Sequence, residues 1–401
     1  METAPHVYQS GKREYRDRIE AVRGIVDLFD DLLLTLDALM KATHLPDHLV
    51  ASPGAVLEEW LDERHMSQRE LADRTSKSEK FISQLINAKA SLTADTAHDL
   101  ELVTGVSADT WLRVEGSYRA MLRRREAIED AGAADSPVEA ALLKFLRDAG
   151  IVTAPARAKG EQLVQVFGLL GVSSTDGLAR LTKRHAAAFR VSTSFTPDAV
   201  AIEVLLRLAH DQADLVPTPA YDESRLRAAL PRLRALTVSA PAEAAVTARE
   251  ELATCGVALV FVPSVPKAHC HGVTMWKGER VIVALSDRGK SEDHFWFTLF
   301  HELAHVLAGK RDEIYLEGPV DGDRPDWEVE ADAFATETLI PASAEPQLHA
   351  LVSLQDATDL AAELGVSPAI VVGRLQHLGL KPFSWGNGLK RRVEVHWPGG
   401  A

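Results

Sequence analysis

The segment WFTLFHELAHVLAG (296–309) constrains the fold of this chain more than any other stretch. Apolar residues surround the polar ones so closely that a helix formed here is buried on nearly all sides. His301 and His305 are four residues apart, so on a helix they share a face and can present two imidazoles to one point. Unpaired polar groups are costly inside a protein, so these histidines and Glu302 need partners from another element.

The residue types and their spacing suit a metal site. Zinc binds imidazole nitrogens at about 2.0–2.1 Å in tetrahedral geometry, and catalytic sites leave one position to water. Glu302 follows the first histidine directly and can act as general base on that water. The pattern therefore predicts a catalytic site with one Zn2+ per chain. The alternative is a core or solvated helix that carries no metal.

A third ligand is expected from the next predicted helix, over 327–340, which opens with the acidic sequence DWEVEADAF. Glu328 and Asp332 are again four residues apart. Glu328 can therefore complete the coordination, and Asp332 can accept the outer N–H of a ligand histidine. Glu330 points roughly to the far side of this helix and is the weaker candidate. Asp326 is expected to be the N-cap, which places Glu328 in the first turn.

Two questions about this region stay open at the level of sequence. The run AHCH (268–271) contains three competent ligands, but their spacing is too tight for one structural zinc, and Cys255 is the only other cysteine. Several side chains could also stabilise the oxyanion of a hydrolytic reaction, and the sequence does not choose among them. These candidates are Arg288, His294, Tyr315 and His377.

Helical spacing dominates the chain before this region and strand-like runs begin only later. From Ala55 to about Asp214 the apolar pattern predicts helices, whereas GVALVFVPSV (256–265) and RVIVALS (280–286) are β-branched runs typical of strands. Further helices are expected at 224–236 and within 354–379. The Gly-, Trp- and Arg-rich tail from Pro382 is expected to pack loosely.

The segment MSQRELADRTSKSEKFISQLINAKA (66–90) has the spacing of a helix-turn-helix. A first helix at about 67–73 and a turn over 74–77 lead to Ser78, the expected N-cap of a second helix. The polar N-terminal half of that second helix can enter a major groove, while flanking residues contact phosphates. The alternative is a helical bundle that does not touch DNA. The expected DNA-contacting residues are Gln68, Lys77, Glu79, Lys80, Ser83, Gln84 and Lys89.

Charge and composition limit what this chain can bind and where it acts. Its 44 Lys and Arg face 58 Asp and Glu, a formal net charge of -14, so any DNA binding must come from a local patch. Within 66–90 five basic residues face three acidic ones, a weak footprint for binding that depends on phosphate contacts. Two cysteines, no signal-peptide pattern and no membrane-spanning apolar run predict a soluble cytoplasmic protein without membrane partners.

Both motifs resemble known families. WFTLFHELAH followed by EVEADAFATETLIP (328–341) is similar to the ImmA/IrrE family of zinc metallopeptidases, over about 257–378. That resemblance implies a gluzincin-like fold with His301, His305 and Glu328 as zinc ligands, Glu302 as catalytic acid and base, and Asp332 as a supporting carboxylate where Asn is common in the family. Residues 53–119 resemble the Cro/cI-like domains of HigA-type antitoxins, and 120–250 resembles the helical middle of long regulators of this kind.

The predicted fold class is therefore multi-domain, with an all-α N-terminal half containing the helix-turn-helix and an α+β, zincin-like C-terminal domain. The expected boundaries are a helical lead-in over 1–50, a Cro/cI-like domain over 51–119, a helical middle domain over 120–238, a metallopeptidase domain over 239–381 and a tail over 382–401.

The resemblances imply a HigA-like regulator fused to an ImmA/IrrE-type peptidase. We expect it to bind operator DNA, as a homodimer, and to cleave a repressor-type protein, either a partner or itself, in a stress or mobile-element response. Its activity can depend on an activating partner or ligand. One alternative is a HigA-type antitoxin that binds a toxin and its own operator and whose peptidase fold is regulatory or weakly active. Another is a protease that does not bind DNA and whose helical half recruits substrate.

Overall fold

The computed structural model describes residues 50–133, 135–186, 189–191, 197–286, 291–309, 311, 314–317 and 325–393. The expected lead-in helix before residue 50 and Arg288 lie outside these ranges. The chain divides into two compact units, Met1–Glu126 and Ala127–Ala401. No helix in the described ranges is long and apolar enough to cross a membrane. The five domain boundaries expected from the sequence stay a prediction.

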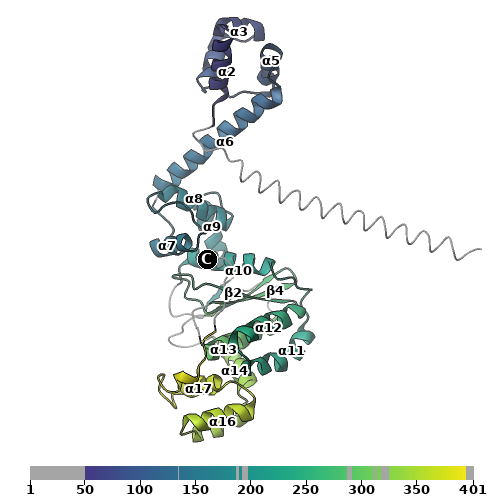
Figure 1. Cartoon of the computed structure of the whole chain (residues 1–401), viewed down its shortest axis with the longest axis vertical. Coiled ribbons are helices and arrows are strands. Elements are labelled where there is room, and N and C mark those ends of the chain that lie inside the picture. The colour runs from purple at the N-terminus through teal and green to yellow at the C-terminus, as the bar shows by residue number, and fades with distance from the viewer. Residues whose placement is uncertain are drawn as a thin grey trace, which may run out of the picture. The chain divides into compact units, whose positions relative to one another are not determined.

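In its described residues, 50–126, the first unit is built from helices alone. Its elements are α2 (Pro53–Glu63), α3 (Gln68–Thr75), α4 (Glu79–Ile86), α5 (Ala94–Thr104) and the long α6 (Ala108–Ala133), whose residues continue past Glu126 (Figure 1). The serine expected to cap the second helix of the motif does so, because Ser78 Oγ accepts the Phe81 N–H at 3.1 Å. Ser67 caps α3 in the same way through the Glu70 N–H.

The core of this unit lies between α2, α3, α4 and α5 and includes the fully buried Trp111 of α6. Helices α2 and α4 approach so closely at Gly54 that a Cβ there would lie 2.2 Å from the carbonyl oxygen of Ile86. Only glycine allows this crossing without a shift of one helix. The apolar residues Ile82, Leu85 and Ile86 of α4 are buried in this core.

The described residues of the second unit form a mixed five-stranded sheet in the order β1-β5-β3-β4-β2. The strands are β1 (Phe189–Val191), β2 (Val257–Val262), β3 (Gly272–Lys277), β4 (Arg280–Ser286) and β5 (Ile314–Glu317). β2 runs parallel to β4, and β1 runs parallel to β5, whereas β3 is antiparallel to both of its neighbours. The two runs expected to form strands correspond to β2 and β4. Strands β1, β3 and β5 were not predicted from the β-branched pattern.

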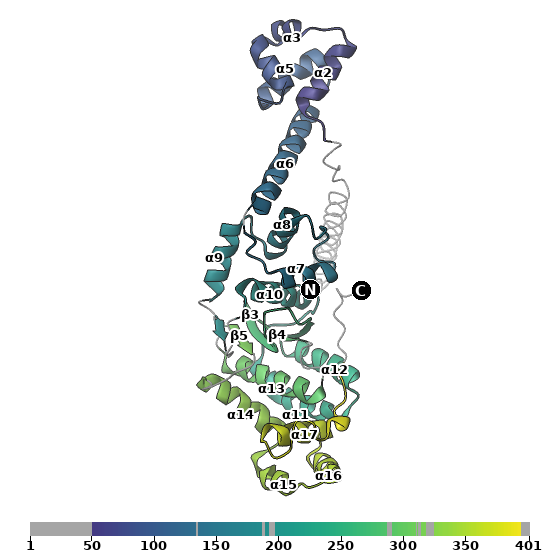
Figure 2. The same cartoon turned by 90° about the vertical axis from the view of Figure 1, so that its left-hand side faces the viewer.

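Helices cover both faces of this sheet (Figures 1 and 2). One core contains Ala258, Val260, Ile282 and Ala284 and packs against α7 (Ala140–Asp148), α8 (Lys159–Leu170) and α10 (Ala199–Asp214), with α9 (Thr175–Ala186) next to α10. The other contains Val257, Leu259, Val281 and Val283 and packs against α11 (Glu223–Ala235), α12 (Pro241–Thr254) and α13 (Glu292–Ala308). Neighbouring strand residues alternate between the two cores, as the pleat requires.

Four helices follow β5 on the α13 side: α14 (Asp326–Leu339), α15 (Glu345–Ala350), α16 (Leu354–Leu364) and α17 (Pro368–His377). Arg234 of α11 joins them, because its guanidinium donates to the carbonyl oxygens of Thr338, Leu339 and Leu364 at 2.7–3.1 Å. These bonds satisfy backbone acceptors at the ends of α14 and α16, which helix geometry leaves without intrahelical partners.

The tail from Pro382 does not pack loosely in its described part, so that expectation was wrong for 382–393. Ser291, the N-cap of α13, forms a β-bridge with Arg392. Lys390 Nζ lies 2.5 Å from the buried Asp293 carboxylate, and the Arg391 guanidinium donates to the fully buried Glu292. Two of the tail's basic side chains, Lys390 and Arg391, thus bind the buried carboxylates in the first turn of α13.

Candidate metal centre and nucleic-acid interface

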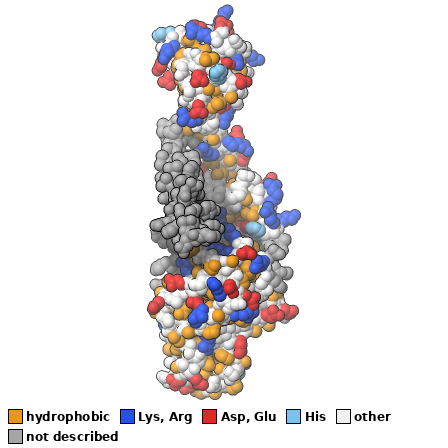
Figure 3. Space-filling model, turned by 90° about the vertical axis from the view of Figure 1, so that its right-hand side faces the viewer, with side chains coloured by type: hydrophobic (Ala, Val, Ile, Leu, Met, Phe, Trp, Pro, Cys, Tyr) orange, Lys and Arg blue, Asp and Glu red, His pale blue; other side chains and the backbone are white. Residues whose placement is uncertain are grey.

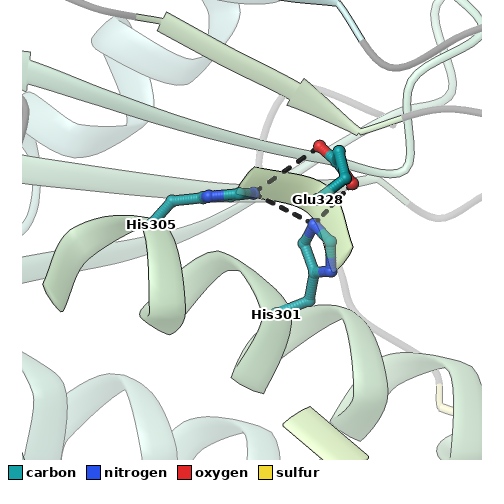
Figure 4. Close-up of side chains that lie close together, drawn as sticks. All are labelled: His301, His305 and Glu328. Carbon is teal, nitrogen blue, oxygen red and sulfur yellow. Dashed lines mark hydrogen bonds and ion pairs between the residues drawn. The ribbon is translucent and has the colours of Figure 1, made fainter. Parts of the chain in front are cut away.

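His301 and His305 lie on α13 and point from it toward Glu328 in the first turn of α14 (Figure 4). His301 Nε2 lies 3.0 Å from His305 Nε2 and 3.2 Å from Glu328 Oε2. His305 Nε2 lies 3.7 Å from Glu328 Oε1. All three side chains are buried, at 0 %, 2 % and 2 % exposure. The structure therefore brings the three proposed ligands to one buried point.

The start of α14 differs from the expectation in one detail. Pro325, and not Asp326, occupies the N-cap position, and Asp326 is the first helical residue. The fixed φ of proline, here -59°, precedes the helix and lets Asp326 enter it directly. Glu328 remains in the first turn, as expected, where a negative charge is favoured by the helix dipole.

Asp332 lies one turn beyond Glu328, and its Oδ1 is 3.0 Å from His301 Nδ1. When His301 carries its proton on Nδ1, this bond directs the lone pair of Nε2 toward His305 and Glu328. Glu330, the weaker candidate on the same helix, is exposed. Helix α13 therefore supplies the two imidazoles. One face of α14 supplies two carboxylates: Glu328 next to both imidazoles, and Asp332 bound to the far nitrogen of His301.

The environment favours the protonation states that can bind a metal. Burial lowers the pKa of His305, and the charge of His301 lowers it further, while Glu328 acts in the opposite direction. Burial raises the pKa of Glu328, but the two imidazoles outweigh this effect and lower it to about 2. At neutral pH Glu328 is therefore an anion and His305 is neutral, the forms in which carboxylate and imidazole act as ligands.

Glu302 is fully buried beside this cluster, on the side of strand β3. Its Oε2 accepts a hydrogen bond of 2.5 Å from Thr274 Oγ1. Gly272, two residues earlier on β3, has no side chain, and a Cβ there would lie 2.2 Å from Glu302 Oε1. Neither Thr274 nor Gly272 was among the site residues predicted from the sequence. A sequence signal for them exists: in the strand GVTMWK, the small Gly272 and the polar Thr274 occupy alternate positions, which face the same side of the sheet.

Of the four candidates for oxyanion stabilisation, Tyr315 of β5 lies at the cluster. Its ring stacks on His305 with centroids 4.3 Å apart and an angle of 7° between the planes. Trp327 contacts both rings, at 5.5 Å from His305 and 5.2 Å from Tyr315. His294 stacks instead on His271 at 6.2 Å, and His377 lines a cavity of about 350 Å³ together with Asp332.

The competing cluster at 269–271 does not form a metal site of this kind. Within the described ranges, His301, His305 and Glu328 are the one group of three His, Cys, Asp or Glu side chains whose ligand atoms all lie within 4.8 Å of one another. Cys270 is buried, and its Sγ lies 2.8 Å from the Gly272 carbonyl oxygen.

The residues expected to contact DNA lie on α3, on α4 and in the loops next to them. Glu79, Lys80, Gln84 and Lys89 are exposed, and Gln68, Lys77 and Ser83 are partly buried. Lys77 Nζ forms an ion pair with Asp99 at 2.9 Å, so a phosphate would have to compete with that carboxylate. On the face seen in Figure 3, basic and acidic side chains are interspersed over the first unit. The described residues form no dense basic patch on that face.

Two family models match this chain. Residues 57–111 match the helix-turn-helix model, and residues 258–376 match the model of the IrrE N-terminal-like domain, a peptidase family. The uncharacterised HTH-type transcriptional regulator YddM of Escherichia coli (strain K12) is 35% identical over 66 residues, which are 16% of this chain and 70% of that protein. The chain belongs to the HTH-type transcriptional regulators. Its second unit adds an IrrE-like peptidase domain to the regulator.

The regulator is also similar to a solved structure, an addiction module antidote protein of a HigA family from Coxiella burnetii. The sequences are 24% identical, the match covers 22% of the regulator and 98% of that chain, and the TM-score is 0.20.

Proposed function

We propose that this HTH-type regulator is also a zinc-dependent endopeptidase, which binds operator DNA through α3 and α4 and cleaves a repressor-type protein, a partner or the chain itself. The observation that carries the enzymatic part is the buried cluster of His301, His305 and Glu328, with Asp332 behind His301 and Glu302 beside it. A structural core would not favour five polar side chains gathered at one point, because each must be desolvated.

The donor set fits zinc. Two imidazoles and one carboxylate are a set typical of catalytic sites, which keep a fourth position for water or substrate. Ligand atoms bound at about 2.0–2.2 Å in a tetrahedron lie roughly 3.3–3.6 Å from one another. The three distances here are 3.0, 3.2 and 3.7 Å, close to those values. Glu328 Oε1 is moreover buried without a hydrogen-bond donor among the described residues, as suits an atom that faces a cation.

Zinc held here supplies a Lewis acid and makes a water molecule acidic enough to react near neutral pH. The chain's own residues move the protons. Glu302 accepts a proton at its carboxylate from the attacking water and returns it to the leaving amine nitrogen. Asp332 holds His301 in one tautomer through Nδ1, and Glu328 keeps its negative charge at neutral pH. Tyr315, whose ring lies on His305, is a candidate donor to the oxyanion.

The regulatory part of the proposal depends on α4. Its exposed residues Lys80 and Gln84 lie one turn apart, near enough to enter a major groove together, and Lys89 follows the helix where a phosphate contact is expected. Proteolysis would then control a repressor: cleavage of a partner, or of this chain, would change the occupancy of the operator.

Metal content and proteolysis together test the enzymatic proposal. The full chain should carry one zinc, as should Glu302→Gln and the matched control Glu330→Gln, whereas Glu328→Gln should lose zinc by more than the 10–100-fold typical of supporting residues. Cleavage of the chain itself and of a quenched peptide library should be seen with the wild type and Glu330→Gln only. A wild type without zinc would refute the site, and equal cleavage by Glu302→Gln would refute the role of that carboxylate.

The antitoxin alternative makes a different prediction. It requires a stable complex with a toxin and leaves operator binding insensitive to both zinc and Glu302→Gln. Gel-shift measurements with genomic fragments, with and without a chelator, separate the two functions. A DNA affinity that changes when cleavage occurs favours the regulator with an active peptidase.

A further inference from the structure

The side chain of Glu302, on α13, is contacted by a residue of the central strand β3. Thr274 Oγ1 lies 2.5 Å from Glu302 Oε2 and 3.2 Å from the Glu302 carbonyl oxygen. A hydroxyl has one proton to donate, and the shorter contact, to a carboxylate, is the stronger of the two. The Thr274 hydroxyl therefore donates its proton to the Glu302 carboxylate and not to the carbonyl oxygen.

Thr274 itself has little freedom to move. It is fully buried at the centre of the sheet, paired with Val283 of β4 on one side and with Tyr315 of β5 on the other. Branching at Cβ further restricts its side-chain rotamers. A hydroxyl held in this way presents its proton in one direction, so the bond constrains Glu302 and not the reverse.

Packing alone does not explain a threonine at this position. Valine has nearly the same shape and a higher preference for buried strands, and it avoids the cost of burying a hydroxyl. The neighbouring Gly272 is equally unusual for a strand, where glycine weakens pairing. Both choices are explained by Glu302: Gly272 leaves room for the Oε1 side of the carboxylate, where a Cβ would lie at 2.2 Å, and Thr274 binds Oε2.

The residue paired with Thr274 on the neighbouring strand also contacts the candidate metal centre. Tyr315, the partner of Thr274 on β5, stacks on His305. One row of side chains across β3 and β5 thus contacts both the proposed proton carrier and one of the proposed ligands. Thr274 and Tyr315 are paired neighbours on β3 and β5, so strand pairing, and not a flexible loop, sets the spacing of these two contacts.

We infer that Thr274 is a positioning residue: its hydroxyl holds the Glu302 carboxylate in the orientation that proton transfer requires. The inference rests on the proposed function, since orientation of Glu302 matters to catalysis only if Glu302 moves protons. Gly272 supports it by leaving the space that the carboxylate occupies.

The test compares three variants of the full chain: Thr274→Val, which keeps the shape and removes the hydroxyl; Thr274→Ser, which keeps the hydroxyl; and Thr237→Val. Thr237 is a matched control because it is also fully buried, and its hydroxyl has no hydrogen-bond partner within the described residues. If Thr274→Val does not fold, Thr274→Ala replaces it in the comparison with serine.

The first measurement is binding of acetohydroxamate to the zinc-loaded proteins by calorimetry. A hydroxamate chelates zinc and offers a protonated group to the adjacent carboxylate. We expect affinity to fall about tenfold in Thr274→Val, as for the loss of one charge-assisted hydrogen bond, and to be restored in Thr274→Ser. Thr237→Val should bind like the wild type, and zinc affinity should be equal in all four proteins.

The second measurement needs no metal: crystal structures of the metal-free proteins. Glu302 should leave its wild-type rotamer in Thr274→Val and keep it in Thr274→Ser and Thr237→Val. An unmoved Glu302 in Thr274→Val, or an unchanged hydroxamate affinity, overturns the inference. A wild type that binds no zinc overturns the proposed function instead, and the metal-free structures still decide whether Thr274 positions the carboxylate.

Discussion

Replacing Arg391 by methionine is expected to loosen the start of α13, the helix that carries His301 and His305. Glu292, in the first turn of that helix, is fully buried, and its Oε2 accepts from Arg391 Nε at 2.9 Å and from Nη2 at 2.5 Å. Its Oε1 accepts the backbone N–H of Arg391 at 3.1 Å. Arg391→Met removes the two side-chain donors and leaves a buried carboxylate with the backbone bond alone.

The free-energy cost of Arg391→Met depends on how deeply each partner of the Arg391–Glu292 ion pair is buried. Removing one partner of a buried ion pair costs about 3–5 kcal/mol, because the remaining charge is uncompensated. The Arg391 side chain is 40% exposed, so water already weakens the pair, and one backbone donor survives the substitution. We therefore expect a loss of about 2–3 kcal/mol, which corresponds to roughly 30–150-fold more frequent opening of the helix start.

Hydrogen exchange measured by mass spectrometry can resolve this effect, because it reports local opening of α13 and not the unfolding of the whole chain. Arg392→Met is the matched control: it removes the same charge from the neighbouring exposed residue, whose side chain has no ion pair with the described residues. Peptides from α4, in the other unit, provide an internal reference. Exchange in α13 that differs by less than about threefold between the two variants would contradict the reasoning.

Three further predictions concern other parts of the molecule. Burial raises the pKa of Tyr221 to about 12, so the folded state disfavours phenolate; the stability due to the neutral phenol is present below pH ~10 and lost as pH rises through 12. Tyr221→Phe should therefore flatten the alkaline loss of stability and remove one late-titrating phenol from the 295 nm absorbance curve. Gly54→Ala should destabilise the first unit by about 1–3 kcal/mol in thermal unfolding, because its Cβ would meet Ile86 O at 2.2 Å, whereas Gly116→Ala, with nothing within 4 Å, should not. Zinc at 100 times its dissociation constant should stabilise the second unit by about 2.7 kcal/mol, and equal melting temperatures with and without a chelator would argue against the site.

The sequence predicted those elements that are determined by a few consecutive residues. The spacing of His301 and His305 placed both on one face of α13, and the same spacing of Glu328 and Asp332 placed both on one face of α14. Strands β2 and β4 were predictable because they are continuous β-branched runs. Ser78 was a predictable cap because capping depends on a residue and the three that follow it.

Elements that depend on distant partners were missed or mistaken. β1 and β5, three and four residues long, carry no periodic signal of their own and form because they pair with each other, and β5 also pairs with β3. The tail was expected to be loose, because its glycines and charges resemble a solvated segment. Its order comes from Glu292 and Asp293, almost one hundred residues earlier, which bind Arg391 and Lys390.

In the candidate site, too, some features are set by neighbouring residues and others by distant ones. By itself the sequence determined which residues could bind a metal, since helical periodicity decides which side chains share a face. Only the tertiary structure decided that the two faces meet, that Tyr315 lies on His305, and that Thr274 binds Glu302. The physical reason is that helix geometry is set within a few residues, whereas a contact between a helix and a sheet strand depends on how the whole core packs around them.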